Sequence, residues 1–223
     1  MIFYQQPGII LVLNKYIKME KINNTVKIHV QIITFLIIWG VILLVSKTYT
    51  SIDLWSALRQ IPQAISLYAI TGIIFTKWLW RLPMLQGWLI KVPNLQGTWK
   101  GELKSDWVNP ETGKGVDQIP IILVVRQTFS SIKCTLMTEE SISYSTTADI
   151  NVIPNSEDLY LIYSYTNRPK ATIRDRSPIH DGASILKIIR KPEMRLEGEY
   201  WTSRKTRGDM SLKLESLNLV EKF

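Results

Sequence analysis

The pattern of apolar side chains changes at Pro93. Before it, apolar residues come in long runs typical of helices; from Thr98 onward, apolar and polar residues alternate. Proline cannot continue a helix and biases the preceding residue toward an extended backbone. Alternation with a period of two is the pattern of a half-buried β-strand. The sequence therefore predicts two domains, an N-terminal membrane part over residues 1–91 and a β-domain over residues 92–223.

Charge is divided unequally between these two parts. The first 91 residues contain nine Lys and Arg against two acids, whereas the remainder contains 18 against 17. The net charge of +8 is thus almost wholly a property of the N-terminal part. This distribution favours a role in membrane topology over nucleic-acid binding, so no DNA or RNA partner is expected.

Two segments are candidates to cross a membrane. The run from Ile28 to Val45 has 18 residues with no charge except a partial one on His29, and at about 1.5 Å per residue it spans roughly 27 Å. The second candidate, Pro62 to Trp80, contains several polar residues, and a buried helix of a soluble domain is the alternative. The sequence predicts a two-helix transmembrane hairpin, with spans at about residues 28–45 and 62–80.

Basic residues lie mainly before the first span and after the second. Because cytoplasmic flanks are enriched in Lys and Arg, we expect a multi-pass inner-membrane protein with both termini in the cytoplasm. Residues 83–92 would then lie against the inner headgroups, with lipids as a partner. The segment before Met19 resembles neither a span nor a signal peptide; either Met19 is the true start or a short interfacial helix precedes it.

The β-domain contains eight segments with strand-like alternation, separated by turn sequences. They are Gly97–Lys104, Gln118–Arg126, Phe129–Thr138, Ile142–Val152, Asp158–Thr166, Ala183–Arg190, Met194–Ser203 and Gly208–Glu215. Eight short strands without a helical period predict a closed antiparallel meander barrel, with a sandwich as the alternative. The joint from Asn167 to Gly182 is long, and such loops are usually functional or disordered.

Little in the sequence supports catalysis, so the protein is predicted not to be an enzyme. Cys134, the single cysteine, alternates with apolar residues and is expected in the core. His180, beside Asp181 and Gly182, is typical of a turn. The two histidines are far apart in sequence, and no metal site or cofactor is predicted.

One region of the β-domain is strongly basic and contains aromatic residues. Between Arg168 and Arg207 there are eleven basic residues and five acids. Arginine suits phosphate and aromatic rings suit bases, so a small nucleotide fits this region; attraction to anionic lipid is the alternative, and Tyr163 and Tyr165 also fit ordinary barrel core. The candidate ligand-binding residues are Tyr163, Tyr165, Arg168, Arg174, Arg176, Tyr200, Trp201, Arg204 and Arg207.

Three features of the chain together resemble a known family. They are the two helical spans, the segment Leu95-Gln96-Gly97-Thr98-Trp99 before an eight-strand meander, and the segment Gly198-Glu199-Tyr200-Trp201-Thr202-Ser203-Arg204. The chain resembles the two-transmembrane β-barrel effectors of bacterial cyclic-oligonucleotide anti-phage signalling (CBASS), which are associated with CD-NTase enzymes. The resemblance implies that a CD-NTase synthase supplies a cyclic dinucleotide and that the barrel binds it. Assembly of a homo-oligomer, disruption of the inner membrane and abortive infection would follow.

Gly97-x-Trp99 is also similar to the first-strand signature of lipocalin-type barrels. In that family a late arginine packs on the indole, and Arg204 or Arg207 is the candidate here. The competing hypotheses are therefore a membrane-tethered barrel for an apolar small molecule, or a scaffold without a ligand.

Overall fold

The computed structural model describes residues 17–18, 24–46, 54–108, 112–152 and 157–223. The chain divides into two compact units. The barrel unit contains Leu95–Gln127 and Ser131–Phe223, together with the short strand β1 (Ile17–Lys18). The helical unit contains Glu20–Asn94 and the turn Thr128–Ser130.

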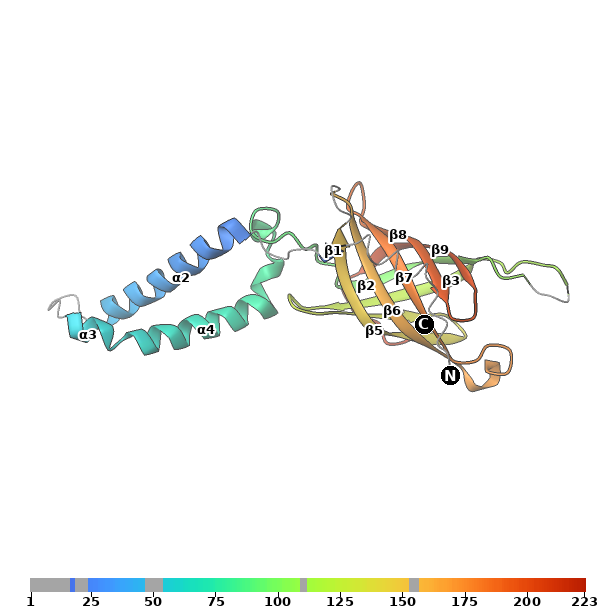
Figure 1. Cartoon of the computed structure of the whole chain (residues 1–223), viewed down its shortest axis with the longest axis horizontal. Helices are drawn as coiled ribbons and strands as arrows, with labels where there is room; N and C mark the ends of the chain where they lie inside the picture. The colour runs from blue at the N-terminus through green and yellow to red at the C-terminus, as the bar shows by residue number, and fades with distance from the viewer. Residues whose placement is uncertain (1–16, 19–23, 47–53, 109–111, 153–156) are drawn as a thin grey trace. The chain divides into compact units, whose positions relative to one another are not determined.

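The barrel unit is a closed ring of eight antiparallel strands (Figure 1). In chain order the strands are β2 (Gly97–Ser105), β3 (Ile119–Gln127), β4 (Ile132–Met137), β5 (Ser141–Val152), β6 (Leu159–Pro169), β7 (His180–Ile189), β8 (Arg195–Thr202) and β9 (Arg207–Ser216). Consecutive strands pair, and β2 pairs with β9 to close the ring. The predicted eight-stranded meander barrel is confirmed. In addition, β1 pairs with Asn151 and Val152 at the end of β5; residues 1–16 and Met19 lie outside the described residues.

The long joint predicted between Asn167 and Gly182 is shorter in the structure. Strand β6 continues to Pro169 and β7 begins at His180, because Asn167 pairs with His180 across this hairpin. The remaining ten residues include the 3-10 turn η4 (Ala171–Ile173). The side chains at these strand ends are polar, so the sequence does not show the period-two pattern there and the longer strands were not predicted.

One end of the barrel interior is filled with large apolar side chains. Leucines from five strands are completely buried there: Leu123, Leu161, Leu186, Leu196 and Leu212. Trp99 on β2 is also fully buried, and its Nε1 donates a hydrogen bond to the Leu95 carbonyl oxygen at 2.9 Å. The Gln127 side-chain carbonyl in turn accepts from the Leu95 backbone N–H at 2.6 Å. The chain entering the barrel is therefore fixed to the end of β3.

The expected contact between a late arginine and the Trp99 indole is wrong for both candidates. Arg207 pairs with Asp106, seven residues along the chain from Trp99 and roughly 20 Å away along an extended strand. Arg204 donates to Ser177 Oγ. Both arginines lie beyond the opposite end of β2, so the indole depends on its hydrogen bond to Leu95.

The helical unit contains α2 (Asn24–Val45), α3 (Leu54–Leu58), α4 (Ile61–Lys77) and the 3-10 turns η2 (Leu79–Arg81) and η3 (Pro83–Leu85). Helices α2 and α4 pack together, with the rings of Phe35 and Tyr68 edge to face at 6.1 Å between centroids. Only α2 among the described helices is long and apolar enough to be a candidate span, over Val26–Val45. Helix α4 has 17 residues and ends before the predicted boundary at Trp80, because the backbone leaves helical geometry at Trp78.

Replacing Trp99 with Phe should destabilise the barrel by about 1–3 kcal/mol, because the buried Leu95 carbonyl loses its donor and the smaller ring leaves a void. Urea unfolding of the full-length protein in micelles, followed by circular dichroism, measures this loss. The matched control is Trp201→Phe, on a partly exposed, outward-facing side chain of β8, which should change stability by less than about 0.5 kcal/mol. Equal losses in the two variants would contradict the role given to Trp99.

Candidate functional site

The other end of the barrel interior is open and forms a cavity of about 920 Å³. Its wall comes from the inward-facing ends of the strands and from the β2–β3 and β6–β7 connections. This volume lies within the range of pockets that hold small molecules and cofactors. Because the opposite end is filled with apolar side chains, this cavity is the part of the barrel interior that can receive a ligand.

Two tyrosines line the cavity from different strands. Tyr165 on β6 and Tyr200 on β8 point inward and are 5% and 7% exposed. Burial, reinforced by Tyr200, raises the pKa of the Tyr165 phenol, although Arg204 opposes this shift. Burial likewise raises the pKa of Tyr200. Both phenols therefore stay protonated at neutral pH, and each can donate a hydrogen bond to a ligand.

A glycine on the neighbouring strand leaves space for the Tyr165 ring. Gly182 on β7 is directly opposite Tyr165 in the antiparallel register. A Cβ atom at Gly182 would lie 2.5 Å from the Tyr165 hydroxyl oxygen and 2.6 Å from the Trp201 carbonyl oxygen. The ring of Tyr165 therefore occupies the space that a side chain at Gly182 would need.

Neutral polar groups gather near the mouth of the cavity. The Asn167 amide donates hydrogen bonds to the hydroxyls of Ser141 and Ser143 at 3.0 and 2.8 Å. Across the mouth, the hydroxyls of Thr202 and Thr206 lie 2.7 Å apart. All five residues line the cavity, so a ligand would meet an amide and several hydroxyl groups there.

Charged groups of both signs complete the wall. Arg204 donates to Ser177 Oγ at 3.0 Å, and Arg176 forms an ion pair with Glu140. Since the Arg204 contact is to a neutral hydroxyl, its positive charge is not neutralised by that partner. Arg204 is therefore the cation of this wall best placed to receive an anionic group.

His180 lies at the same mouth and is held by the backbone. Its Nδ1 lies 2.8 Å from the Pro178 carbonyl oxygen and donates to it. Burial, together with the Arg204 charge, lowers the pKa of His180 below its usual value, while the Pro178 carbonyl and Asp181 oppose this shift. The imidazole is therefore neutral at pH 7 and its Nε2 can accept a hydrogen bond.

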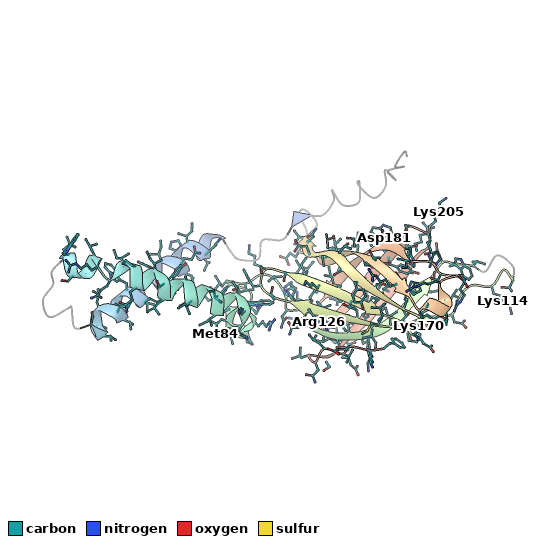
Figure 2. The ribbon with its side chains drawn as sticks, turned by 90° about the horizontal axis from the view of Figure 1, so that it is seen from below. Met84, Lys114, Arg126, Lys170, Asp181 and Lys205 are labelled. Carbon is teal, nitrogen blue, oxygen red and sulfur yellow. The ribbon has the colours of Figure 1, made fainter. Side chains whose placement is uncertain are left out.

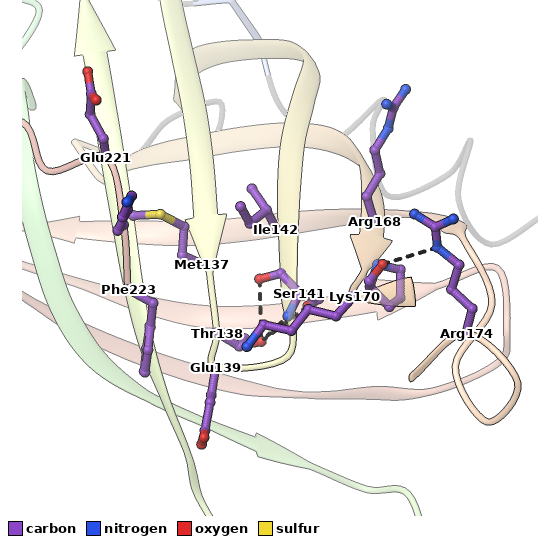
Figure 3. A pocket seen from close by; sticks show the side chains of 12 residues that line it. Met137, Thr138, Glu139, Ser141, Ile142, Arg168, Lys170, Arg174, Glu221 and Phe223 are labelled. Atoms are coloured by element: carbon purple, nitrogen blue, oxygen red, sulfur yellow. Dashed lines mark hydrogen bonds between the residues drawn. The ribbon is translucent and has the colours of Figure 1, made fainter. Parts of the chain in front are cut away.

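The structure separates the nine predicted ligand-binding residues into groups. Four of them line the cavity: Tyr165, Arg176, Tyr200 and Arg204. Tyr163 lies one inward position deeper, 2% exposed, with its ring centroid 5.9 Å from that of Tyr165. Trp201 and Arg207 alternate with inward residues and face outward. Arg168 and Arg174 line a second, smaller cavity of about 530 Å³ (Figure 3).

Several residues that line the cavity were not predicted from the sequence. Asn167 is inward by the same alternation as Tyr163 and Tyr165, but it lies beyond the predicted strand end at Thr166. Ser141 and Ser143 are inward on β5. Trp107 lies in the β2–β3 connection, 42% exposed at the rim of the cavity. The strand register brings Asn167, Ser141 and Ser143 together, and the β2–β3 connection adds Trp107.

The structure also places Cys134 as predicted, in the barrel core. It is buried on β4, and burial raises the pKa of its thiol, so the sulfur stays protonated and unreactive. Among the residues that the structure describes, no group of three His, Cys, Asp or Glu side chains could hold a metal ion. The groups that line the cavity offer a ligand hydrogen bonds, aromatic rings and charge.

Fold and cavity together are those of a β-barrel with an interior pocket large enough for a small molecule. The protein-family model of the Cap15 cyclic dinucleotide receptor domain matches residues 90–214, more than half of the chain. The chain therefore belongs to this family, and its predicted place among the CBASS effectors is confirmed.

Two relatives carry the same name. The chain is 29% identical over 196 residues to CD-NTase-associated protein 15 of Staphylococcus schleiferi, covering 87% of this chain and 97% of the relative. It is 26% identical over 149 residues to CD-NTase-associated protein 15 of Escherichia albertii, covering 66% and 73%. The similarity to the first relative extends over nearly its whole length.

Proposed function

We propose that the open cavity of the barrel binds a cyclic dinucleotide made by a CD-NTase, and that the chain acts as a CBASS membrane effector. The family match supports both the ligand class and the link to a CD-NTase. The observation that carries the proposal is the meeting of Tyr165, Tyr200 and Arg204 in one cavity. The two rings offer faces for bases, and the guanidinium offers charge-assisted hydrogen bonds to phosphate.

The remaining lining groups would add selectivity. Asn167 presents an amide, and Thr202 and Thr206 present hydroxyls that can bond to base edges or ribose. Trp107 at the rim would cover a base from outside. Contact of the ligand with Tyr163, Arg168, Arg174, Arg176, Trp201 and Arg207 stays a prediction.

The competing hypothesis of an apolar ligand has less support from the cavity. The apolar half of the barrel interior is already occupied by Trp99 and the buried leucines. What remains open is lined by apolar side chains, among them Leu103, Ile119 and Leu136, and also by an amide, hydroxyls, phenols, an imidazole and charged groups. A lipid tail placed there would take water away from the Arg204 guanidinium and offer no anionic partner for its charge, which is unfavourable.

Replacing Arg204 with Gln should weaken binding of the cyclic dinucleotide about tenfold, because a hydrogen bond to a charged group contributes about 1.5–3 kcal/mol. Calorimetry of the full-length protein in micelles, with a panel of cyclic dinucleotides, measures the affinity. Affinity should also fall as salt rises, because ions screen the phosphate contact.

The matched control is Arg126→Gln. Arg126 is exposed on the outer surface of β3 and lines neither cavity (Figure 2). The control should bind with the affinity of the unmodified protein. Equal losses of affinity in both variants would show that net charge, and not a contact with Arg204, causes the effect. Absence of binding across the panel would contradict the proposed ligand.

We also propose that α2 and α4 form two spans, with both termini in the cytoplasm and a domain boundary near residue 92. Helix α2 is the stronger candidate span. The 17 residues of α4 would rise about 26 Å, at the lower limit for crossing a bilayer. The excess of basic residues on the outer flanks of both helices supports this orientation.

Assembly of several copies would be needed for membrane disruption, because two helices cannot enclose a pore. The hydroxyls of Ser66 and Thr71 already donate to carbonyls one turn earlier on α4. Gln31 on α2 and Gln63 on α4 are exposed, and in a bilayer such amides favour a neighbouring helix over lipid. We therefore propose that these two glutamines contribute to contacts between copies.

Dye-loaded membrane vesicles test orientation and assembly in one experiment. In inverted vesicles the barrel faces the outside, so added cyclic dinucleotide should enlarge the crosslinked species and release the dye. Right-side-out vesicles, which enclose the barrel, should not respond. A response only in right-side-out vesicles would contradict the orientation, and binding without a change in size would contradict ligand-driven assembly.

A further inference from the structure

The smaller cavity adjoins the barrel cavity, and the two share Thr138, Glu139, Ser141, Pro169 and Phe223 as lining residues. It lies between the end of β4, the start of β5, the end of β6 and the last residues of the chain (Figure 3). Met137 and Ile142, at outward positions of β4 and β5, contribute an apolar part of its lining that the barrel cavity does not share. We call this cavity, of about 530 Å³, the outer pocket.

Three basic side chains from one short segment line the outer pocket: Arg168, Lys170 and Arg174. Arg174 is oriented by its Nε, which donates to the Pro169 carbonyl oxygen at 3.2 Å. Arg168 and Arg174 extend in the same direction in Figure 3. Within the described part of the chain, none of the three has a carboxylate at ion-pair distance, in contrast to Arg176, which is paired with Glu140.

Uncompensated charge of this kind favours an anionic ligand. Guanidinium groups match phosphate oxygens in a forked geometry, and Lys170 adds positive charge to the lining. Glu139 and Glu221 also line the pocket, but in Figure 3 they project away from the two arginines. The apolar lining formed by Ile142, Pro169 and Phe223 would receive an uncharged part of the same ligand.

We propose that the outer pocket is a second anion site that binds the phosphate of an organic phosphate ester. Arg168 and Arg174 hold the phosphate, and the organic part lies on Ile142 and Phe223. The ester is either a free nucleotide or an anionic phospholipid headgroup, since both present the same phosphate oxygens. Arg168, Arg174 and Ile142 line only this site, so its phosphate contacts differ from those proposed for the barrel cavity.

Isoleucine methyl groups report separately on the two cavities. Ile142 lines only the outer pocket and Ile119 lines only the barrel cavity. The full-length protein, labelled at isoleucine methyls in neutral-detergent micelles, is titrated with adenosine monophosphate and with short-chain phosphatidylglycerol. Adenosine, which lacks the phosphate, is the control. At least one phosphate ester should shift the Ile142 signal, and adenosine should not.

The double variant Arg168→Gln with Arg174→Gln should weaken that response about tenfold or more, because two charge-assisted contacts are lost. The matched control is Arg126→Gln with Arg190→Gln, which removes two exposed arginines outside both cavities and should leave the response unchanged. An unchanged signal from Ile121, buried in the barrel core, verifies the fold of each variant.

Each outcome separates this proposal from the function proposed for the barrel. A shift with the nucleotide alone identifies free nucleotide as the source, and a shift with the lipid alone identifies a headgroup. No shift at Ile142 with either probe, or a shift that survives the double variant, would overturn the outer site. A cyclic dinucleotide that shifts Ile142 and not Ile119 would contradict the barrel site and support the outer one.

Discussion

Pairing between β5 and β6 is the constraint on which the rest of the barrel depends. The two strands pair from Ser141 with Pro169 to Val152 with Leu159, with one irregularity near Ser145. Together with the β2–β9 pairing, this closes the ring, so none of the eight strands is left as an open edge. It also carries β6 far enough to bring Asn167 and Tyr165 to the mouth of the barrel.

Closure alone would produce a filled interior, and the distribution of side-chain size makes the two ends different. Trp99 and the buried leucines fill one end, whereas serine, threonine and two tyrosines line the open end together with Leu103 and Leu136. Gly182 shows how the space is shared, since its missing side chain is what admits the Tyr165 ring. The cavity, its polar lining and the proposed nucleotide all follow from this asymmetry.

Period-two alternation predicted eight strands and a Cys134 in the core, and it favoured a closed barrel over a sandwich. It could not place the arginines, because their facing depends on where β6 ends: Arg168 is on an outward position, whereas Arg176 and Arg204 come from connections that return to the mouth. The predicted lipocalin-type contact between an arginine and the Trp99 indole is wrong because Trp99 lies at the opposite end of β2 from Arg207. Helix α4 ends before Trp80 because the backbone leaves helical geometry at Trp78. Hydropathy carries no signal for this change, so the sequence predicted a longer helix.

The imidazole of His180 offers the most direct test that the nucleotide occupies the barrel cavity. In the free protein, burial and Arg204 hold the pKa of His180 below its usual value. A cyclic dinucleotide in the cavity brings two negative phosphates near the ring, which favours the protonated form. An NMR titration of His180 in the full-length protein should therefore show a pKa that rises when the ligand is bound. An unchanged His180 pKa at saturating ligand would contradict a nucleotide site in this cavity.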